Sequence, residues 1–148
     1  MPERHLTLRS TGTTGYIGGD ALYAIVKAHP DWDITCMARN SGKGAKIAAK
    51  YPSIRIVYGD LDSFDLLVEE AQKADIVYHF ADCDHEQSAK AISRGLANAG
   101  KLVHWIHTSG TMILAVETMD KKCWGDELPK VYNDWDGVHE LVNMVCNH

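Results

Sequence analysis

Short apolar runs alternate with amphipathic stretches from the N-terminus to about residue 108. The runs have the length and the Ile, Val and Leu content of buried strands, at residues 6–8, 34–38, 54–58, 76–80 and 102–106. The stretches between them carry apolar residues at helical spacing, at 17–29, 43–51, 64–73 and 86–99. This alternation is typical of a parallel sheet with crossover helices. We therefore predict an α/β fold of the Rossmann type: a doubly wound parallel sheet of about five strands with flanking helices, in a three-layer sandwich.

The regular pattern fades after Thr108, so we predict a loop-rich segment over 108–136. Val138, Leu141, Val142 and Val145 restore an apolar stripe and predict a terminal helix over 137–146. A chain of 148 residues fits one domain of this kind but not two, which predicts a single domain over 1–148.

One departure from the pattern lies at the end of the first predicted strand. Arg9 and Ser10 stand there, where a central parallel strand is usually apolar. Either the register of the strand differs from this interpretation, or the polar pair faces a ligand.

A glycine-rich turn follows the first predicted strand and opens the first helix. Its glycines, Gly12, Gly15 and Gly18, allow a sharp turn and a close approach of the backbone to a pyrophosphate, which the free N–H groups and the helix dipole attract. The alternative is that the glycines only satisfy the geometry of the turn. We predict a dinucleotide-phosphate site with contacts from Gly12, Thr14, Gly15, Tyr16, Ile17 and Gly18.

The end of the second predicted strand indicates which nicotinamide nucleotide binds. Rossmann domains place an acidic residue there for the ribose hydroxyls of NAD, or a basic residue for the 2′-phosphate of NADP. This chain has Arg39 and Lys43, with no acidic residue between Met37 and Lys46, which favours NADP over NAD. The alternative for Arg39 is a solvated surface side chain.

Asp60 and Leu61 follow the third predicted strand, at the rim where an adenine ring would lie. Asp60 either accepts a hydrogen bond from the adenine amino group or caps the next helix.

The charge and composition of the chain argue against several classes of function. The formal net charge of -5 and the lack of a basic cluster argue against nucleic-acid binding. No apolar run reaches the length of a membrane span or of a signal peptide, so we expect a cytoplasmic protein that is not bound to membranes. The cysteines are widely spaced, and the histidines and acidic residues between 79 and 107 match no metal motif, so we expect no metal.

The motifs in residues 11–19, 58–61, 74–79 and 107–110 resemble the atypical and extended short-chain dehydrogenase/reductase superfamily. The resemblance is strongest to fungal proteins described as NAD-dependent epimerases/dehydratases or NmrA-like. It implies a Rossmann fold, a nicotinamide cofactor and a small-molecule substrate. The resemblance also implies that, compared with a full-length relative, roughly the C-terminal half is absent.

The resemblance also suggests catalytic positions. In relatives, the residue matching Ala81 borders the nicotinamide, and a serine matching Ser109 orients the substrate. The family's catalytic tyrosine is followed four residues later by a lysine, which lowers the pKa of the phenol. Here Asp136 stands four residues after Tyr132, so the pair is not supplied. His107 is a second candidate acid or base, with a purely structural role as its alternative.

Two functions follow. The first is a short-chain-dehydrogenase-like enzyme, a reductase, epimerase or isomerase acting on a small organic substrate. The alternative is a catalytically silent module that binds a nicotinamide nucleotide and senses redox state or partners another protein. We also expect a homo-oligomer, because the fifth strand would leave an open sheet edge. The alternative is that the terminal helix folds back and covers this edge within a monomer.

Overall fold

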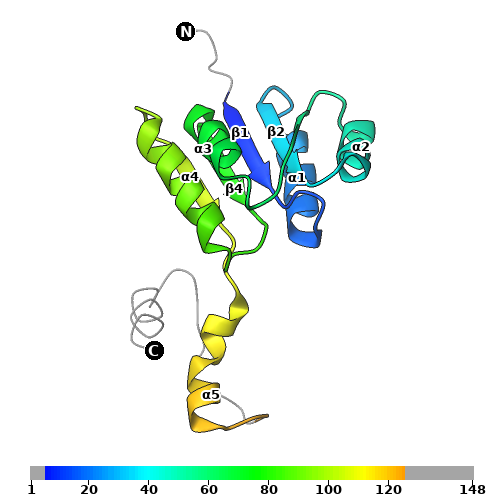
Figure 1. Ribbon diagram of the computed structural model, residues 1–148. Coiled ribbons are helices and arrows are strands. Elements are labelled where there is room, and N and C mark those ends of the chain that lie inside the picture. Colours follow the sequence, from blue (N-terminus) through cyan, green and yellow to red (C-terminus); the bar gives the residue numbers. More distant parts are fainter. Residues whose placement is uncertain (1–5, 126–148) are drawn as a thin grey trace. The chain divides into compact units, whose positions relative to one another are not determined.

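The computed structural model describes residues 6–125 in two compact units, one up to Thr108 and one from Ser109 onward (Figure 1). The first unit alternates strands and helices: β1 (Thr7–Thr11), α1 (Tyr16–Ala28), β2 (Asp33–Ala38), α2 (Ser41–Lys50), β3 (Arg55–Tyr58), α3 (Phe64–Lys73), β4 (Ile76–His79), α4 (Glu86–Asn98) and β5 (His104–His107). Each element lies within a few residues of its predicted range. The predicted α/β alternation is confirmed.

The strands form one parallel sheet in the order β3-β2-β1-β4-β5. β1 is central and pairs with β2 through Leu8 and Ile34, and with β4 through Leu8 and Ile76. Helices α1 and α2 cover one face of the sheet, and α3 and α4 cover the other (Figure 1). The strand order therefore reverses between β1 and β4, which is where a doubly wound sheet opens a crevice at the carboxyl ends of its strands.

The sheet face toward α1 and α2 is apolar. Leu8, Ile34 and Cys36 are buried there against Leu22 of α1 and Ile47 of α2. Burial raises the pKa of the Cys36 thiol to about 11, against a smaller lowering by Thr13. Cys36 is therefore an inert thiol of the core.

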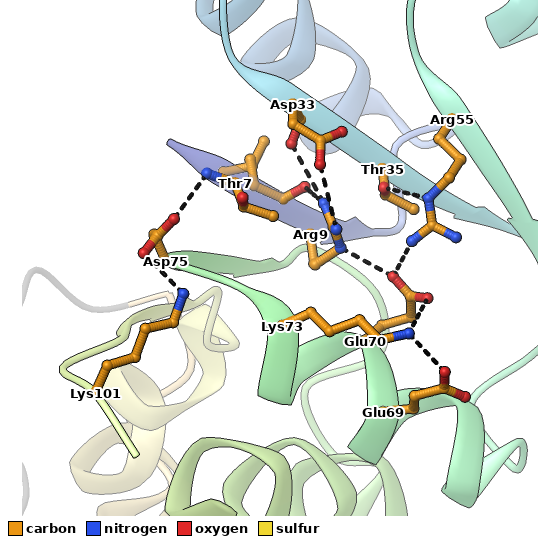
Figure 2. A network of polar contacts seen from close by, with 11 residues as sticks. Thr7, Arg9, Asp33, Thr35, Arg55, Glu69, Glu70, Lys73, Asp75 and Lys101 are labelled. Carbon is orange, nitrogen blue, oxygen red and sulfur yellow. Dashed lines mark hydrogen bonds and ion pairs between the residues drawn. The ribbon is translucent and has the colours of Figure 1, made fainter. Parts of the chain in front are cut away.

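The sheet face toward α3 instead holds a network of charged side chains (Figure 2). Arg9 Nε lies 2.9 Å from Glu70 Oε2, and the same carboxylate oxygen pairs with Arg55. The Arg9 guanidinium also donates to the carbonyl oxygen of Asp33 at 3.3 Å. Arg9 and Glu70 are each only 8% exposed.

This network explains the polar pair in the first strand. β1 continues to Thr11, so Arg9 and Ser10 lie inside the strand rather than at its end. The predicted range of the strand was therefore wrong. Arg9 is tolerated in a central strand because Glu70 of α3 supplies a buried counter-charge.

In the second unit, residues 109–125 contain a 3-10 helix, η1 (Thr111–Ala115), and a short helix, α5 (Val116–Lys121). This part is more helical than the loop-rich segment that the sequence predicts. The rest of that segment and the predicted terminal helix at 137–146 lie outside the described residues. Within residues 6–125, no helix combines the length and the apolar character needed to cross a membrane.

The network gives a stability prediction. Glu70→Gln removes the nearer of the two carboxylates that pair with the buried Arg9, the other being Asp33 at 3.5 Å, and we expect it to lower the free energy of unfolding by roughly 3 kcal/mol. Glu69→Gln is the matched control, because Glu69 is the neighbouring carboxylate, is exposed and pairs only with Lys73 among the ion pairs of residues 6–125. Urea unfolding of both variants measures the difference. Equal midpoints for the two variants would contradict a stabilising role for the network.

Candidate nucleotide-binding site

A cavity of about 400 Å³ lies at the carboxyl ends of β1, β2, β3 and β4. It spans the point where the strand order reverses. Most of the residues predicted to bind a cofactor line this cavity: Gly12, Thr14, Gly15, Arg39, Lys43, Asp60, Leu61 and Ala81. The structure thus brings together segments that lie up to about seventy residues apart in sequence.

The glycine turn needs its glycines for close packing. Gly12 has a φ of +72°, and a Cβ there would lie 2.5 Å from the carbonyl carbon of Phe80. A Cβ on Gly18 would lie 2.4 Å from the carbonyl oxygen of Gly12. Both distances are too short for any side chain, so the turn sits directly on the end of β4.

The start of α1 has the character of an anion site. Gly15 is the N-cap, has no side chain to accept from the first-turn N–H groups, and is followed by no acidic residue in that turn. The positive end of the helix dipole is therefore left without a charged partner from its own first turn. A phosphate is the ligand that such N–H groups favour.

Three predicted contacts do not line the cavity. The side chain of Tyr16 is 97% exposed and that of Ile17 is 55% exposed, while Gly18 packs beneath the turn. If these residues contact a ligand, the contacts come from their backbone N–H groups. Their side chains add nothing to the lining.

Two cations stand at the β2 end of the cavity. Arg39 is exposed and forms no ion pair with any side chain in residues 6–125. Lys43 lies in the first turn of α2, whose N-cap Asn40 accepts a hydrogen bond from the Lys43 N–H at 2.9 Å. Arg39 and Lys43 therefore both present positive charge to the same cavity.

The side chain of Asp60 stabilises the turn before α3 through hydrogen bonds. Its Oδ1 accepts hydrogen bonds from the Ser63 hydroxyl at 2.8 Å and from the Asp62 N–H at 3.2 Å. The Ser63 bond is the main reason why the pKa of Asp60 is below its ordinary value. Ser63, not Asp60, is the N-cap of α3. Asp60 is thus a turn residue on the cavity wall, and its contact with adenine stays a prediction.

Sequence reasoning missed three lining residues, Met37, Phe80 and Asp82. Phe80 stacks on Tyr78 with ring centroids 5.3 Å apart. Their position in the sequence could have identified them, since each lies at or just beyond the end of a strand that contributes to the crevice. From their apolar character alone, Met37 and Phe80 would be predicted to lie in the hydrophobic core.

His107 and Ser109, the predicted catalytic residues, are not among the residues that line the cavity. His107 is half-buried on β5, and its ring centroid lies 4.8 Å from that of His79. Ser109 is exposed and opens the second unit. Tyr132 and Asp136 lie outside the described residues. The catalytic roles stay predictions.

Within residues 6–125, one group of side chains offers three metal-ligand atoms within 4.8 Å of one another: Asp82, Cys83 and Asp84. They are consecutive residues, and the carboxylates are exposed. Exposed acidic groups in a row are common without a metal, so the expectation of no metal is unchanged.

Comparison with known proteins identifies the family. Residues 11–118 match the NAD dependent epimerase/dehydratase family. The chain belongs to this family, within the extended short-chain dehydrogenase/reductase superfamily that its motifs resemble. The match covers the glycine turn, all the residues lining the cavity and both predicted catalytic residues.

Individual proteins are similar to this chain in sequence or in fold. The chain is 41% identical over 135 residues to the oxidase ucsJ from Acremonium sp., and this alignment covers 90% of this chain and 39% of the oxidase. Among solved structures, a wide-type short-chain dehydrogenase/reductase from Veillonella parvula in complex with NADP shares the fold, with a TM-score of 0.60 and 17% sequence identity. The superposition covers 96% of this chain and 64% of that chain. DesIV, a dTDP-glucose 4,6-dehydratase from Streptomyces venezuelae with NAD bound, gives a TM-score of 0.55 at 23% identity over 72% of this chain and 40% of that chain.

The chain spans less than half the length of the curated relatives that it matches. The matched part contains the glycine turn and the crevice.

The packing of the turn predicts the effect of a single methyl group. Gly18→Ala places a Cβ against the Gly12 carbonyl, so the turn must shift, and we expect NADPH binding to weaken by at least about tenfold. Gly42→Ala is the control, because its Cβ would meet nothing closer than 3.6 Å and Gly42 does not line the cavity. Calorimetric titration measures both variants. Equal affinity in Gly18→Ala and Gly42→Ala would show that the turn does not touch the nucleotide.

A second prediction concerns His79, which is fully buried. Burial, followed by the neighbouring His107, lowers its pKa below the ordinary 6.5, while a hydrogen bond to the Asp82 backbone opposes the shift. The folded protein excludes a proton that the unfolded chain takes up. As the pH falls below about 6.5, stability is therefore lost, by up to about 1.4 kcal/mol per pH unit until the folded pKa is reached.

Urea unfolding from about pH 8 to pH 5 checks this linkage in the parent protein and in His79→Asn, which has no titrating ring. The difference in free energy of unfolding between the two proteins should be constant above about pH 7 and shrink below pH 6.5. Parallel curves over the whole range would contradict a neutral, buried His79.

Proposed function

We propose that this chain binds NADP(H) in the cavity at the carboxyl ends of β1 to β4. The observation that carries the proposal is the convergence of the glycine turn, the cations Arg39 and Lys43 and small rim residues on one crevice at the reversal of strand order. Family membership supports a nicotinamide nucleotide as the ligand. The solved relatives include proteins with NADP and with NAD bound, so the preference for NADP rests on this chain's own residues.

The cavity residues fit the parts of the nucleotide. The space that a Cβ at Gly12 or Gly18 would need is already taken by backbone, and the N-cap of α1 leaves donors for the pyrophosphate. Arg39 and Lys43 supply donors and positive charge for a 2′-phosphate. Asp60, held as a carboxylate by Ser63, keeps Oδ2 as an acceptor for the adenine amino group.

We further propose that the full protein uses this nucleotide to transform a small organic substrate, as a reductase, epimerase or dehydratase. When bound, a nicotinamide ring supplies hydride transfer. Ala81 on the cavity wall leaves room for that ring, and Ser109 and His107 follow as candidate substrate-orienting and proton-moving groups. Family membership does not favour the alternative of a catalytically silent module.

The surroundings of the protein stay predictions. A cytoplasmic location, the absence of membrane and nucleic-acid partners, and a small-molecule substrate follow from the sequence arguments above. For a homo-oligomer, β5 adds support, because among residues 6–125 it pairs only with β4, and Leu102 and Ile106, beside and within β5, are 80% and 47% exposed. An apolar sheet edge of this kind favours association.

The choice of cofactor is testable through Arg39. Arg39→Ala removes a donor to the 2′-phosphate, so we expect NADPH to bind about tenfold more weakly while NADH affinity stays within about twofold. Arg94→Ala is the control, because Arg94 is an exposed arginine on α4 that does not line the cavity. Calorimetric titration with both nucleotides measures the effects.

Each outcome addresses a different part of the proposal. No binding of NADPH or NADH at about millimolar concentration by the parent protein would overturn nucleotide binding as a whole. A clear preference for NADH, or an equal loss of both nucleotides in Arg39→Ala, would overturn only the assignment of NADP.

A further inference from the structure

A buried histidine joins the end of β1 to the start of α4. His79 is the last residue of β4 and has no exposed surface. Its Nδ1 lies 2.7 Å from the Thr11 hydroxyl, and its Nε2 lies 3.5 Å from the Ser88 hydroxyl. Thr11 and Ser88 are also buried, at 5% and 0% exposure. Histidine is rarely enclosed in this way without a role for its ring nitrogens.

The hydrogen bonds assign the proton on the ring. The Ser88 hydroxyl donates to the His85 carbonyl oxygen at 2.8 Å, which leaves it as an acceptor toward His79. His79 Nε2 therefore carries the hydrogen, and the unprotonated Nδ1 accepts from the Thr11 hydroxyl. In the neutral ring the Thr11 hydroxyl donates to Nδ1, whereas in a protonated ring Nδ1 carries a hydrogen and the same hydroxyl has to accept.

Thr11 stands directly before the first glycine of the turn. The Phe80 N–H donates to the Thr11 carbonyl oxygen at 3.3 Å, and Gly12 rests on the Phe80–Ala81 peptide so closely that no Cβ fits. The His79–Thr11 hydrogen bond joins the same two strand ends through their side chains. It therefore links the residue just before the glycine turn to the last residue of β4.

Ser88 extends the connection to the opposite rim. Its N–H donates to His85 Nδ1 at 3.1 Å, and His85 Nε2 lies 3.2 Å from Asp62 Oδ1. Asp62 belongs to the same turn as Asp60, which lines the cavity. A continuous series of polar contacts thus runs from the end of β1, through the start of α4, to the turn before α3.

We propose that His79 is a positioning residue for the phosphates of the bound nucleotide: its neutral ring, held between Thr11 and Ser88, fixes the glycine turn against β4 and the N-terminus of α4. This inference rests on the proposed nucleotide binding. His79 touches no ligand itself, since it does not line the cavity.

The neighbouring residue of β1 offers a matched control. Ser10 is buried to the same extent as Thr11, at 5% exposure, but its hydroxyl has no hydrogen-bond partner among the described residues. Removing the Ser10 hydroxyl costs no contact to the turn. A role of His79 that is only to fill space would predict similar results for both hydroxyls.

The test measures nucleotide affinity in three variants. NADP⁺ and NAD⁺ are titrated calorimetrically into the parent protein, Thr11→Val, Thr11→Ser and Ser10→Ala. Thr11→Val keeps the side-chain shape without the hydroxyl, and we expect both nucleotides to bind about tenfold more weakly. Thr11→Ser restores the donor and should recover affinity to within about threefold, and Ser10→Ala should stay within about twofold.

Nitrogen NMR of the histidine rings gives a readout that does not depend on the ligand. The His79 ring should be neutral with its hydrogen on Nε2, and its Nδ1 resonance should shift in Thr11→Val but not in Ser10→Ala. This measurement still tests the hydrogen bond if a variant binds nothing.

The outcomes separate the two proposals. Failure of the parent protein to bind either nucleotide overturns the proposed function and this inference with it. Binding by the parent protein, with Thr11→Val equal to Ser10→Ala, overturns this inference alone. Hydrogen on Nδ1 of His79, or no recovery in Thr11→Ser, also overturns it.

Discussion

The structure depends on one close contact, between the glycine turn and the end of β4. Gly12 rests on the Phe80–Ala81 peptide at a distance that excludes a Cβ, and Gly18 rests in the same way on Gly12. These contacts bring the N-terminus of α1 down onto the sheet at the reversal of strand order. The orientation of the helix dipole, the location of the cavity and the approach of Ala81 to it all follow from this packing.

The sheet holds this arrangement with two different faces. Toward α1 and α2 it is apolar, and burial of aliphatic side chains stabilises it. Toward α3 and α4, polar side chains alternate with apolar ones, and their desolvation is offset by specific partners, Glu70 for Arg9 and Thr11 for His79. An apolar face tolerates many substitutions, whereas a paired polar face fixes which residues must meet. The second face therefore pairs particular residues of the sheet with particular residues of the helices, Arg9 with Glu70 of α3 and His79 with Ser88 of α4.

The sequence predicts most of the fold and the location of the site, because both depend on local patterns. The alternation of apolar runs and helical stripes finds every strand and helix of the first unit, and the spacing of Gly12, Gly15 and Gly18 finds the turn. The buried Arg9 was misread as the end of a strand, because its partner Glu70 lies sixty-one residues away in sequence. Met37 and Phe80 were missed for a similar reason, since apolar side chains on a cavity wall have the same pattern as core residues.

The proposed function assigns nucleotide binding and the chemical step to different parts of the chain. Every residue that lines the cavity lies between Gly12 and Asp82, whereas the candidates for the chemical step begin at His107. A Rossmann unit can thus complete the nucleotide site before the chain reaches the residues that act on a substrate. Under the proposed function, the part of the chain before β5 therefore holds the nucleotide, and the candidates for the chemical step lie from His107 onward.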